Sequence, residues 1–341
     1  MLGTILCCVS AGSLNLLLLG RVLIGGVPTA GIGGVTVRAE ARGRGLVTPL
    51  FEHMLAESRR RGAVISALYP TSPGIYRRFG YAPVVDLMEL RVRTRDLAVP
   101  GDTVPVRRAT AADLPAIREV YTRWAVAHNG PLTRSGVSFP DTDEDALKAV
   151  SGITVAESGS GGVSGYVSWD RGSGYGAEAS IKVWDLHADD AASLTSLMNA
   201  IGSFSSVADT TVIRTSGDPE WRHLLRQGSV QQVHRNPYAM TVLDVRVLEL
   251  LRYPDGLELV LPFVWRGEGH VLSVASGRGH VETGEVGPVR QIDAAGLALT
   301  ISGAQRSAAL RRLGHLTGGV GHDEFWDFLF GSRQPAVRDY Y

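Results

Sequence analysis

The chain has 341 residues, of which 44% are hydrophobic and 20% are charged. This composition can form a substantial core, and the length suits roughly two or three domains, so an intrinsically disordered protein is excluded. The 34 basic and 34 acidic side chains balance to a formal net charge of zero. Because no overall field attracts nucleic acid or an anionic membrane, we expect neither as a partner.

The start of the chain is strongly apolar, as a secretory signal or a membrane helix would be. However, Met1 to Leu19 has no basic start, and Asn15 interrupts the apolar run. We therefore predict two strands, roughly Thr4 to Val9 and Leu14 to Ile24, in a cytoplasmic protein.

A glycine-rich turn, Arg42-Gly43-Arg44-Gly45, separates a short alternating strand at Val35 to Val37 from an amphipathic helix. The helix carries apolar residues at helical spacing from Leu46 to Leu55. Such a turn leaves backbone N–H groups unpaired at the positive end of the helix dipole, where an anion is stabilised. The two arginines add charge-assisted donors, so the turn predicts a pyrophosphate site. A purely structural turn is the alternative, since glycine serves tight turns in many proteins.

After this helix come an apolar stretch from Val64 to Pro70 and the sequence Ile75-Tyr-Arg-Arg-Phe-Gly-Tyr-Ala-Pro. The order of strand, turn, helix, strand and Tyr-x-x-x-Gly-Tyr resembles the acetyl-coenzyme A core of the GNAT N-acetyltransferases. The resemblance implies two groups of residues that bind acetyl-coenzyme A: Val35, Thr36 and Val37 at the pantetheine arm, and Arg42, Gly43, Arg44, Gly45 and Leu46 at the pyrophosphate. It also implies that Tyr76 protonates the coenzyme A thiolate. The alternative for Tyr76 is a core aromatic residue beside Phe79 and Tyr81.

The GNAT fold normally begins with a strand and two helices, which precede this sheet and form one wall of the acceptor cleft. No residue before Met1 supplies them in this sequence. We therefore expect either that Met1 is an internal start or that the protein is a truncated, inactive form.

A second unit is expected after a linker from Thr94 to Gly101. Thr110, followed three positions on by Asp113, is a capping signature for a helix, and further strands lead to a helix from Ala191 to Phe204. This order also resembles a GNAT domain. At the place of the pyrophosphate turn, however, Trp184 to Asp190 has no glycine or arginine and has three carboxylates, which would repel a phosphate. The second unit therefore resembles a degenerate copy that has lost the cofactor.

The cluster of Asp185, His187, Asp189 and Asp190 has the residue types of a metal site. Capping of the following helix by Asp189 or Asp190 explains the cluster without a metal ion. We therefore expect no metal.

A third unit begins near Arg235, with short strands between glycine turns and helices at 293–301, 305–313 and 323–330. It resembles the sterol-carrier-like third domain of the enhanced-intracellular-survival type of GNAT acetyltransferase. The expected fold class is therefore α+β, with two GNAT-type acyl-CoA N-acyltransferase domains and a sterol-carrier-protein-like domain. The expected boundaries are 1–100 for the catalytic domain with a truncated start, 101–234 for the degenerate GNAT-like domain, and 235–341 for the third domain.

The chain ends with Pro335-Ala-Val-Arg-Asp-Tyr-Tyr. In the enhanced-intracellular-survival family the tail returns to the active site of the first domain, where its terminal α-carboxylate acts as, or orients, the general base on the acceptor amine. The resemblance implies this role for the carboxylate of Tyr341, and an aromatic end can be anchored in an apolar pocket. A frayed tail is the alternative.

The resemblance implies an N-acetyltransferase that moves an acetyl group from acetyl-CoA to a primary amine, on an aminoglycoside-like polycation or a lysine side chain. It also implies a homo-oligomer, which is a hexamer in that family. Two alternatives stay open. One is a catalytically inactive CoA-binding or scaffold protein, and the other is a lipid carrier that acts through the third domain.

Overall fold

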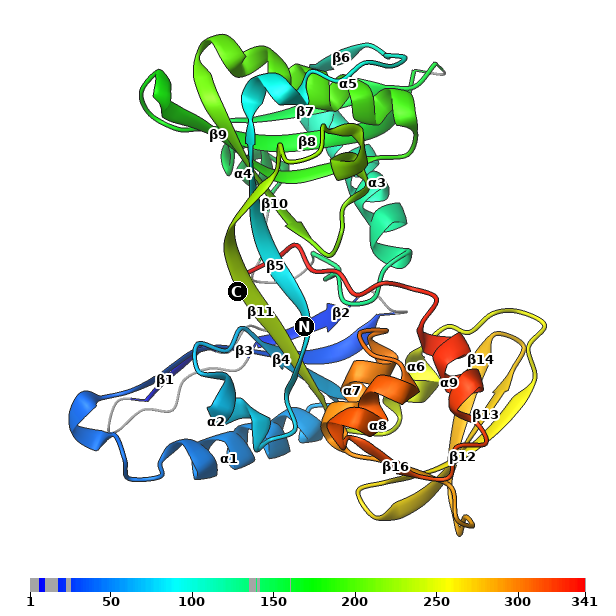
Figure 1. The fold of residues 1–341 in the computed structure, drawn as a ribbon. Helices are drawn as coiled ribbons and strands as arrows, with labels where there is room; N and C mark the ends of the chain where they lie inside the picture. Colours follow the sequence, from blue (N-terminus) through cyan, green and yellow to red (C-terminus); the bar gives the residue numbers. More distant parts are fainter. Residues whose placement is uncertain are drawn as a thin grey trace. The chain divides into compact units, whose positions relative to one another are not determined.

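The computed structural model describes residues 6–9, 18–22, 26–134, 139, 142–159 and 161–340, which form two compact units (Figure 1). The first unit takes its residues from Met1–Val85, His128–Ser138 and Pro237–Tyr341, and the second from Asp86–Ala127 and Phe139–Asn236. Each unit has a hydrophobic core of its own. No helix in the described ranges combines the length and the hydropathy needed to cross a membrane.

The first sheet of the first unit is built around β3 (Val27–Val37). This strand pairs in parallel with β1 (Leu6–Val9) and β4 (Ile65–Leu68), and antiparallel with β2 (Leu18–Val22). The end of β11 (Gln231–Val242) pairs antiparallel with β4. Both strands predicted near the chain start are therefore present, as β1 and β2, and the outer residues of the two predicted ranges lie outside the described part.

Helix α1 (Val47–Arg60) packs onto the core of this sheet through one face. Its buried residues, Leu50, Phe51, Met54 and Leu55, recur at the spacing that places side chains on a single helical face. They pack together with residues of β3, β4 and α2 (Pro73–Arg77). The short 3-10 turn η1 (Ala39–Ala41) leads from β3 towards α1. The predicted succession of strand, turn, helix and strand is therefore confirmed.

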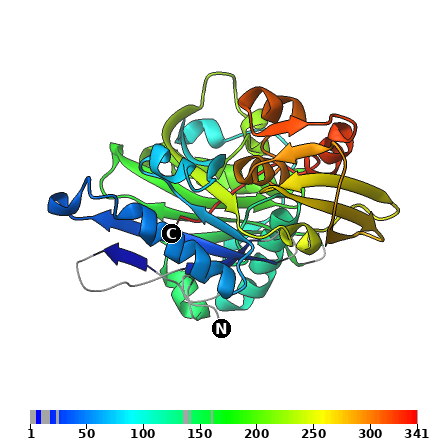
Figure 2. The same ribbon diagram turned by 90° about the horizontal axis from the view of Figure 1, so that it is seen from below.

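The rest of the first unit is a five-stranded sheet in the order β14-β13-β12-β15-β16, with helices beside it. Its strands are β12 (Leu259–Trp265), β13 (Glu268–Ala275), β14 (Arg278–Thr283), β15 (Arg290–Ile292) and β16 (Leu316–Gly318). The helices are α6 (Val247–Leu250), α7 (Ala294–Ile301), α8 (Ser307–Leu313) and α9 (Asp323–Phe330). α7, α8 and α9, coloured orange to red, lie together beside the gold strands in both views (Figures 1 and 2). Buried Phe263 and Trp326, whose ring centroids are 5.2 Å apart, join β12 to α9.

The second unit is one mixed sheet, with strand order β5-β10-β9-β8-β7-β6. Its strands are β5 (Ala82–Arg93), β6 (Val106–Arg108), β7 (Gly152–Glu157), β8 (Val163–Arg171), β9 (Gly176–Ala188) and β10 (Ala208–Ser216). The helices are α3 (Leu114–Val126), α4 (Asp143–Lys148) and α5 (Ala191–Gly202). Short 3-10 turns are η2 (Thr94–Leu97), η3 (Ala111–Asp113), η4 (Ser203–Ser206) and η5 (Glu220–Leu224). α5 connects the parallel strands β9 and β10, which makes a β-α-β crossover.

Two sequence predictions in the second unit have opposite outcomes. The capping signature is confirmed, because the main-chain N–H and the hydroxyl of Thr110 donate to Asp113 Oδ2 at 2.8 and 2.9 Å in front of α3. The prediction of a plain linker after β5 is wrong. Leu97 is 1% exposed, and the N–H of Val99 donates to Asn199 Oδ1 at 2.8 Å. The segment packs because its apolar side chains complete the core of this unit.

Candidate active site

Near its carboxyl end, β3 has one edge that pairs with no described strand. The pairing of β3 with β4 stops at Ile32, but β3 continues to Val37. Among the described strands only β1 pairs with this last stretch, and a strand has two edges, so one edge keeps free backbone N–H and C=O groups. Gly34 has a φ of 66°, and β3 gains one residue on β1 at this point, as at a β-bulge. The three residues predicted to meet the pantetheine arm, Val35, Thr36 and Val37, lie on this stretch.

The glycine turn follows and is open to solvent, since every residue from Arg42 to Leu46 is exposed. Gly43 and Gly45 have φ values of 77° and 71°, and no atom lies within 4 Å of the place where a Cβ would stand. Glycine is therefore needed for the backbone conformation and not for lack of space.

Five consecutive main-chain N–H groups, those of residues 43–47, find no acceptor among the described residues. The next amide, that of Thr48, donates to the carbonyl of Gly45 at 3.2 Å. α1 begins here without a capping side chain, so the positive end of its dipole adds to these N–H groups. Such an array is the arrangement that binds phosphate groups at helix starts.

Three arginines surround the turn, and none of them forms an ion pair with a described carboxylate. Arg42 donates through Nε to the carbonyl of Val37 at 3.3 Å, which connects the turn to the end of β3. Arg44 is exposed. Arg78, which follows α2, donates to the Thr48 hydroxyl at 3.2 Å in the first turn of α1. Arg78 could not be assigned to the site from the sequence, although it belongs to the basic pair after Tyr76, because only the fold brings it to the start of α1.

Tyr76 lies on the short helix α2 and is 8% exposed. Its ring meets that of Phe51 edge to face, with centroids 5.3 Å apart, and lies 6.3 Å from the ring of Tyr81. Burial raises the pKa of the Tyr76 hydroxyl above its ordinary value, and the side chain of Thr71 opposes the rise. Tyr76 is therefore protonated at neutral pH, as a proton donor must be. Tyr81 is fixed in the core instead, with its hydroxyl 2.6 Å from Ser66 Oγ.

The chain's last segment runs along the first unit to a point beside the end of β4. Asn129 holds its start, since its N–H donates to the carbonyl of Gln334 at 3.0 Å and its carbonyl accepts from Ala336 at 2.8 Å. Tyr69, which directly follows β4, donates its hydroxyl proton to the carbonyl of Asp339 at 2.5 Å. The rings of Tyr69 and Tyr340 have centroids 4.6 Å apart. Tyr341, predicted to carry the catalytic carboxylate, lies outside the described residues.

The acidic cluster of the second unit has structural partners. Asp190 caps α5 by accepting from the N–H of Ser193 at 2.8 Å, which confirms helix capping. Asp189 pairs with Arg123 at 2.6 Å. Asp185 and His187 are buried. Within the part of the chain that the structure describes, no three potential ligands come together as a metal site.

Two segments of the chain match family models, both described as an acetyltransferase (GNAT) domain. The matched residues are 7–84 and 130–247, together more than half of the chain. The chain belongs to the GNAT acetyltransferases. The first GNAT match contains β3, the glycine turn and Tyr76, so the free N–H groups lie in a segment with an independent GNAT assignment.

The GNAT relatives include proteins of the enhanced-intracellular-survival type, so the predicted resemblance is confirmed. The chain is 28% identical over 219 residues to an uncharacterized N-acetyltransferase of Streptomyces avermitilis, covering 58% of this chain and 52% of that protein. It is 33% identical over 128 residues to the N-acetyltransferase Eis of Mycobacterium tuberculosis, covering 34% of this chain and 31% of that protein. The chain thus spans about half the length, or less, of these relatives.

A solved GNAT structure matches nearly the whole chain. The GCN5-related N-acetyltransferase from Kribbella flavida superimposes with a TM-score of 0.81 at 27% sequence identity. The match covers 97% of this chain and 85% of that one. The fold is therefore shared far beyond the two GNAT segments.

Proposed function

We propose that this chain transfers an acetyl group from acetyl-CoA to a primary amine, carried by an aminoglycoside-like polycation or a lysine side chain. The observation that carries the proposal is the set of free main-chain N–H groups at residues 43–47, with arginines around them and the start of α1 behind. This array suits a pyrophosphate, which acetyl-CoA has and most simple acyl donors lack. The GNAT matches and the N-acetyltransferase relatives support the same activity.

The cofactor is proposed to lie along β3 and over the turn. The free edge at Val35, Thr36 and Val37 would pair with the amides of the pantetheine arm, as an added strand pairs with a sheet edge. The N–H groups and the side chains of Arg42 and Arg44 would hold the pyrophosphate. Arg78 adds a third cation at the same helix start. The acetyl group would then lie farther along the sheet, towards α2.

The proposed chemistry needs one acid and one base. The neutral amine nitrogen attacks the thioester carbonyl carbon, the C–S bond breaks, and the departing thiolate takes a proton from the Tyr76 hydroxyl. The proton leaving the amine goes to the terminal carboxylate of Tyr341, directly or through a water molecule. Each positioned proton-transfer group typically contributes about 10²- to 10⁴-fold to the rate. The docking of residues up to Tyr340 beside Tyr69 supports this role for the chain end.

We also propose that residues 235–341 form a sterol-carrier-like domain whose task is to support this tail. The five-stranded sheet with helices beside it is the observation that supports this proposal. The second unit, without a glycine turn, is proposed to shape the protein and not to bind cofactor. We propose a homo-oligomer on the resemblance to the Eis family alone.

The test is thiol release from acetyl-CoA with a panel of aminoglycosides and lysine peptides, for the wild type and Tyr76→Phe. We expect release that depends on the amine, and a kcat at least about tenfold lower in Tyr76→Phe with unchanged acetyl-CoA affinity. Tyr175→Phe, at a 74% exposed tyrosine of the second unit, is the matched control and should keep full activity. Binding of acetyl-CoA without thiol release would leave only a CoA-binding protein. The absence of both binding and release would refute the cofactor proposal.

A further inference from the structure

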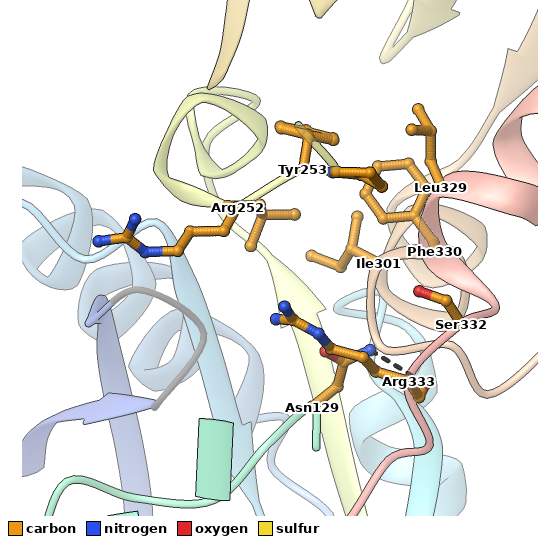
Figure 3. Close-up of a pocket in the computed structure, with 10 residues that line it drawn as sticks. Asn129, Arg252, Tyr253, Ile301, Leu329, Phe330, Ser332 and Arg333 are labelled. Carbon is orange, nitrogen blue, oxygen red and sulfur yellow. Dashed lines mark hydrogen bonds between the residues drawn. The ribbon is translucent and has the colours of Figure 1, made fainter. Parts of the chain in front are cut away.

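A cavity of about 120 Å³ opens in the first unit, away from the cofactor turn (Figure 3). It lies between the segment after α6, the end of α7 and the end of α9. Its apolar wall includes Leu251, Tyr253, Ile301, Leu329 and Phe330. A single buried water needs only about 10–15 Å³ of such space, so the cavity has room for a small organic molecule.

The charged side chains of the wall are cationic. Arg252 and Arg333 line the cavity, and no acidic residue does. Neither arginine forms an ion pair with a described carboxylate. In Figure 3 Arg333 reaches across the cavity, while Arg252, which is exposed, extends outward at its rim.

The cavity wall is held in place by its own contacts. The carbonyl of Arg333 accepts from Asn129 Nδ2 at 3.3 Å, which fixes the backbone beneath the guanidinium. The hydroxyl of Tyr253 donates to the carbonyl of Leu248 at 2.7 Å, so this polar atom is already satisfied. The Tyr253 and Phe330 rings pack edge to face, with centroids 6.1 Å apart. The surface thus combines an apolar wall with an arginine whose backbone is held in place.

We propose that this cavity binds a small carboxylate with a short aliphatic or aromatic body. The apolar floor would take the body, and Arg333 would bind the carboxylate through the paired N–H groups of its guanidinium. The proposal does not depend on the proposed acetyl transfer, because no residue of the cofactor turn or of α2 lines the cavity.

The cavity also lies at the root of the C-terminal tail. Asn129, one of its lining residues, makes main-chain hydrogen bonds to Gln334 and Ala336, and its side chain bonds the carbonyl of Arg333. A bound carboxylate would therefore stabilise the segment from which the tail departs. Its occupancy should slow hydrogen exchange in residues 334–340.

The test is calorimetric titration of the full chain with hexanoate and benzoate, beside hexanamide and hexylamine as neutral and cationic matches. We expect hexanoate and benzoate to bind, and we expect hexanamide and hexylamine not to bind. Arg333→Met should weaken carboxylate binding about tenfold or more, because it removes the charge and keeps the apolar stem. Arg312→Met, at an exposed arginine of the same unit outside the cavity, should bind as the wild type does.

A second variant separates loss of binding from loss of fold. Ser332→Phe fills the cavity mouth without removing a charge, and it should block hexanoate while the melting temperature stays near that of the wild type. The proposal is overturned if carboxylates give no heat at millimolar concentration. It is equally overturned if hexanamide binds as tightly as hexanoate, or if Arg333→Met binds unchanged. If the hydrogen-exchange rates of residues 334–340 are the same with and without bound carboxylate, the link between the cavity and the tail is refuted.

Discussion

Tyr76 shows how one buried hydroxyl can serve as an acid without being charged first. Its ring is enclosed by Phe51 and Tyr81, and this burial disfavours the phenolate. A tyrosine with a raised pKa holds its proton over the whole neutral range. The coenzyme A thiolate, whose conjugate thiol has a pKa of about 8.5, is a weaker base than a tyrosine phenolate. The two pKa values are still close enough for the departing thiolate to take the proton of Tyr76.

The raised pKa of Tyr76 predicts the pH dependence of kcat. Its protonated form is the active one, so the loss of activity due to Tyr76 should appear only above its ordinary pKa of about 10. We expect kcat to rise or stay level from pH 7 to pH 9.5, measured by thiol release. In Tyr76→Phe any alkaline loss that begins above pH 10 should be absent. A fall in kcat below pH 9.5 that vanishes in Tyr76→Phe would contradict the raised pKa.

Gly43 offers a second test at the scale of one residue. Its φ of 77° is a left-handed backbone conformation, which destabilises a residue with a Cβ by about 1–2 kcal/mol. No neighbouring atom would clash with an added Cβ. Gly43→Ala should therefore lower the stability slightly and weaken acetyl-CoA binding several-fold, because it disturbs the neighbouring free N–H groups. Gly62, at the other end of α1, has a φ of 86° and equally open surroundings. Gly62→Ala should cost similar stability, and acetyl-CoA titrations that show equal weakening in both variants would refute the role of the turn.

At the scale of elements, the C-terminal tail is held by a segment far away in the sequence. Asn129 forms a bridge to Pro335, and its side chain donates to the carbonyl of Ser302 at 3.1 Å. Further along, Arg134 pairs with Asp339 at 3.0 Å. The neighbouring Gly130 has a φ of 116°, and a Cβ there would lie 2.5 Å from the carbonyl oxygen of Ala336. The segment is therefore shaped to receive the tail.

Gly130→Ala should displace the tail while the rest of the chain stays folded. We expect faster hydrogen exchange in residues 334–340, and a kcat reduced about as much as by deletion of the last residues, with unchanged acetyl-CoA affinity. Gly284→Ala is the control, since Gly284 has open space around it and no left-handed φ. If Gly130→Ala exchanges faster in the tail but keeps full kcat, the chain end has no part in catalysis.

Local patterns in the sequence were sufficient to predict many elements. The apolar spacing of Leu50, Phe51 and Met54 indicated α1, and the capping pair of Thr110 and Asp113 indicated the start of α3. β10 was missed because two of its buried positions, Thr211 and Thr215, are polar threonines, and its partners β5 and β9 come from other parts of the chain. This segment forms a strand because it pairs with neighbouring strands, more than because of the β-propensity of its own residues.

The candidate site was predictable only where it is local. The glycine turn and Tyr76 form continuous motifs, so the sequence indicated them directly. The contact of Arg78 with Thr48, the free edge of β3 and the bridge from Asn129 to the tail all depend on chain folding over long separations. No periodicity or residue spacing can indicate such contacts.

At the scale of the whole molecule, the two units differ in the groups that they place where a GNAT domain has its pyrophosphate turn. The first has the open N–H array after β3, and the second has Asp189 paired with Arg123 and Asp190 capping α5. The negative charges of Asp189 and Asp190 would repel a phosphate group. We therefore expect one acetyl-CoA bound per chain, at the first unit.

The most direct measurement is amide hydrogen exchange, read by mass spectrometry, with and without saturating acetyl-CoA. We predict that peptides spanning residues 42–47 become protected, because the pyrophosphate oxygens accept from the free N–H groups there. Peptides spanning residues 184–190 of the second unit should not change. Saturable binding of acetyl-CoA that leaves residues 42–47 unprotected would contradict the proposed cofactor site.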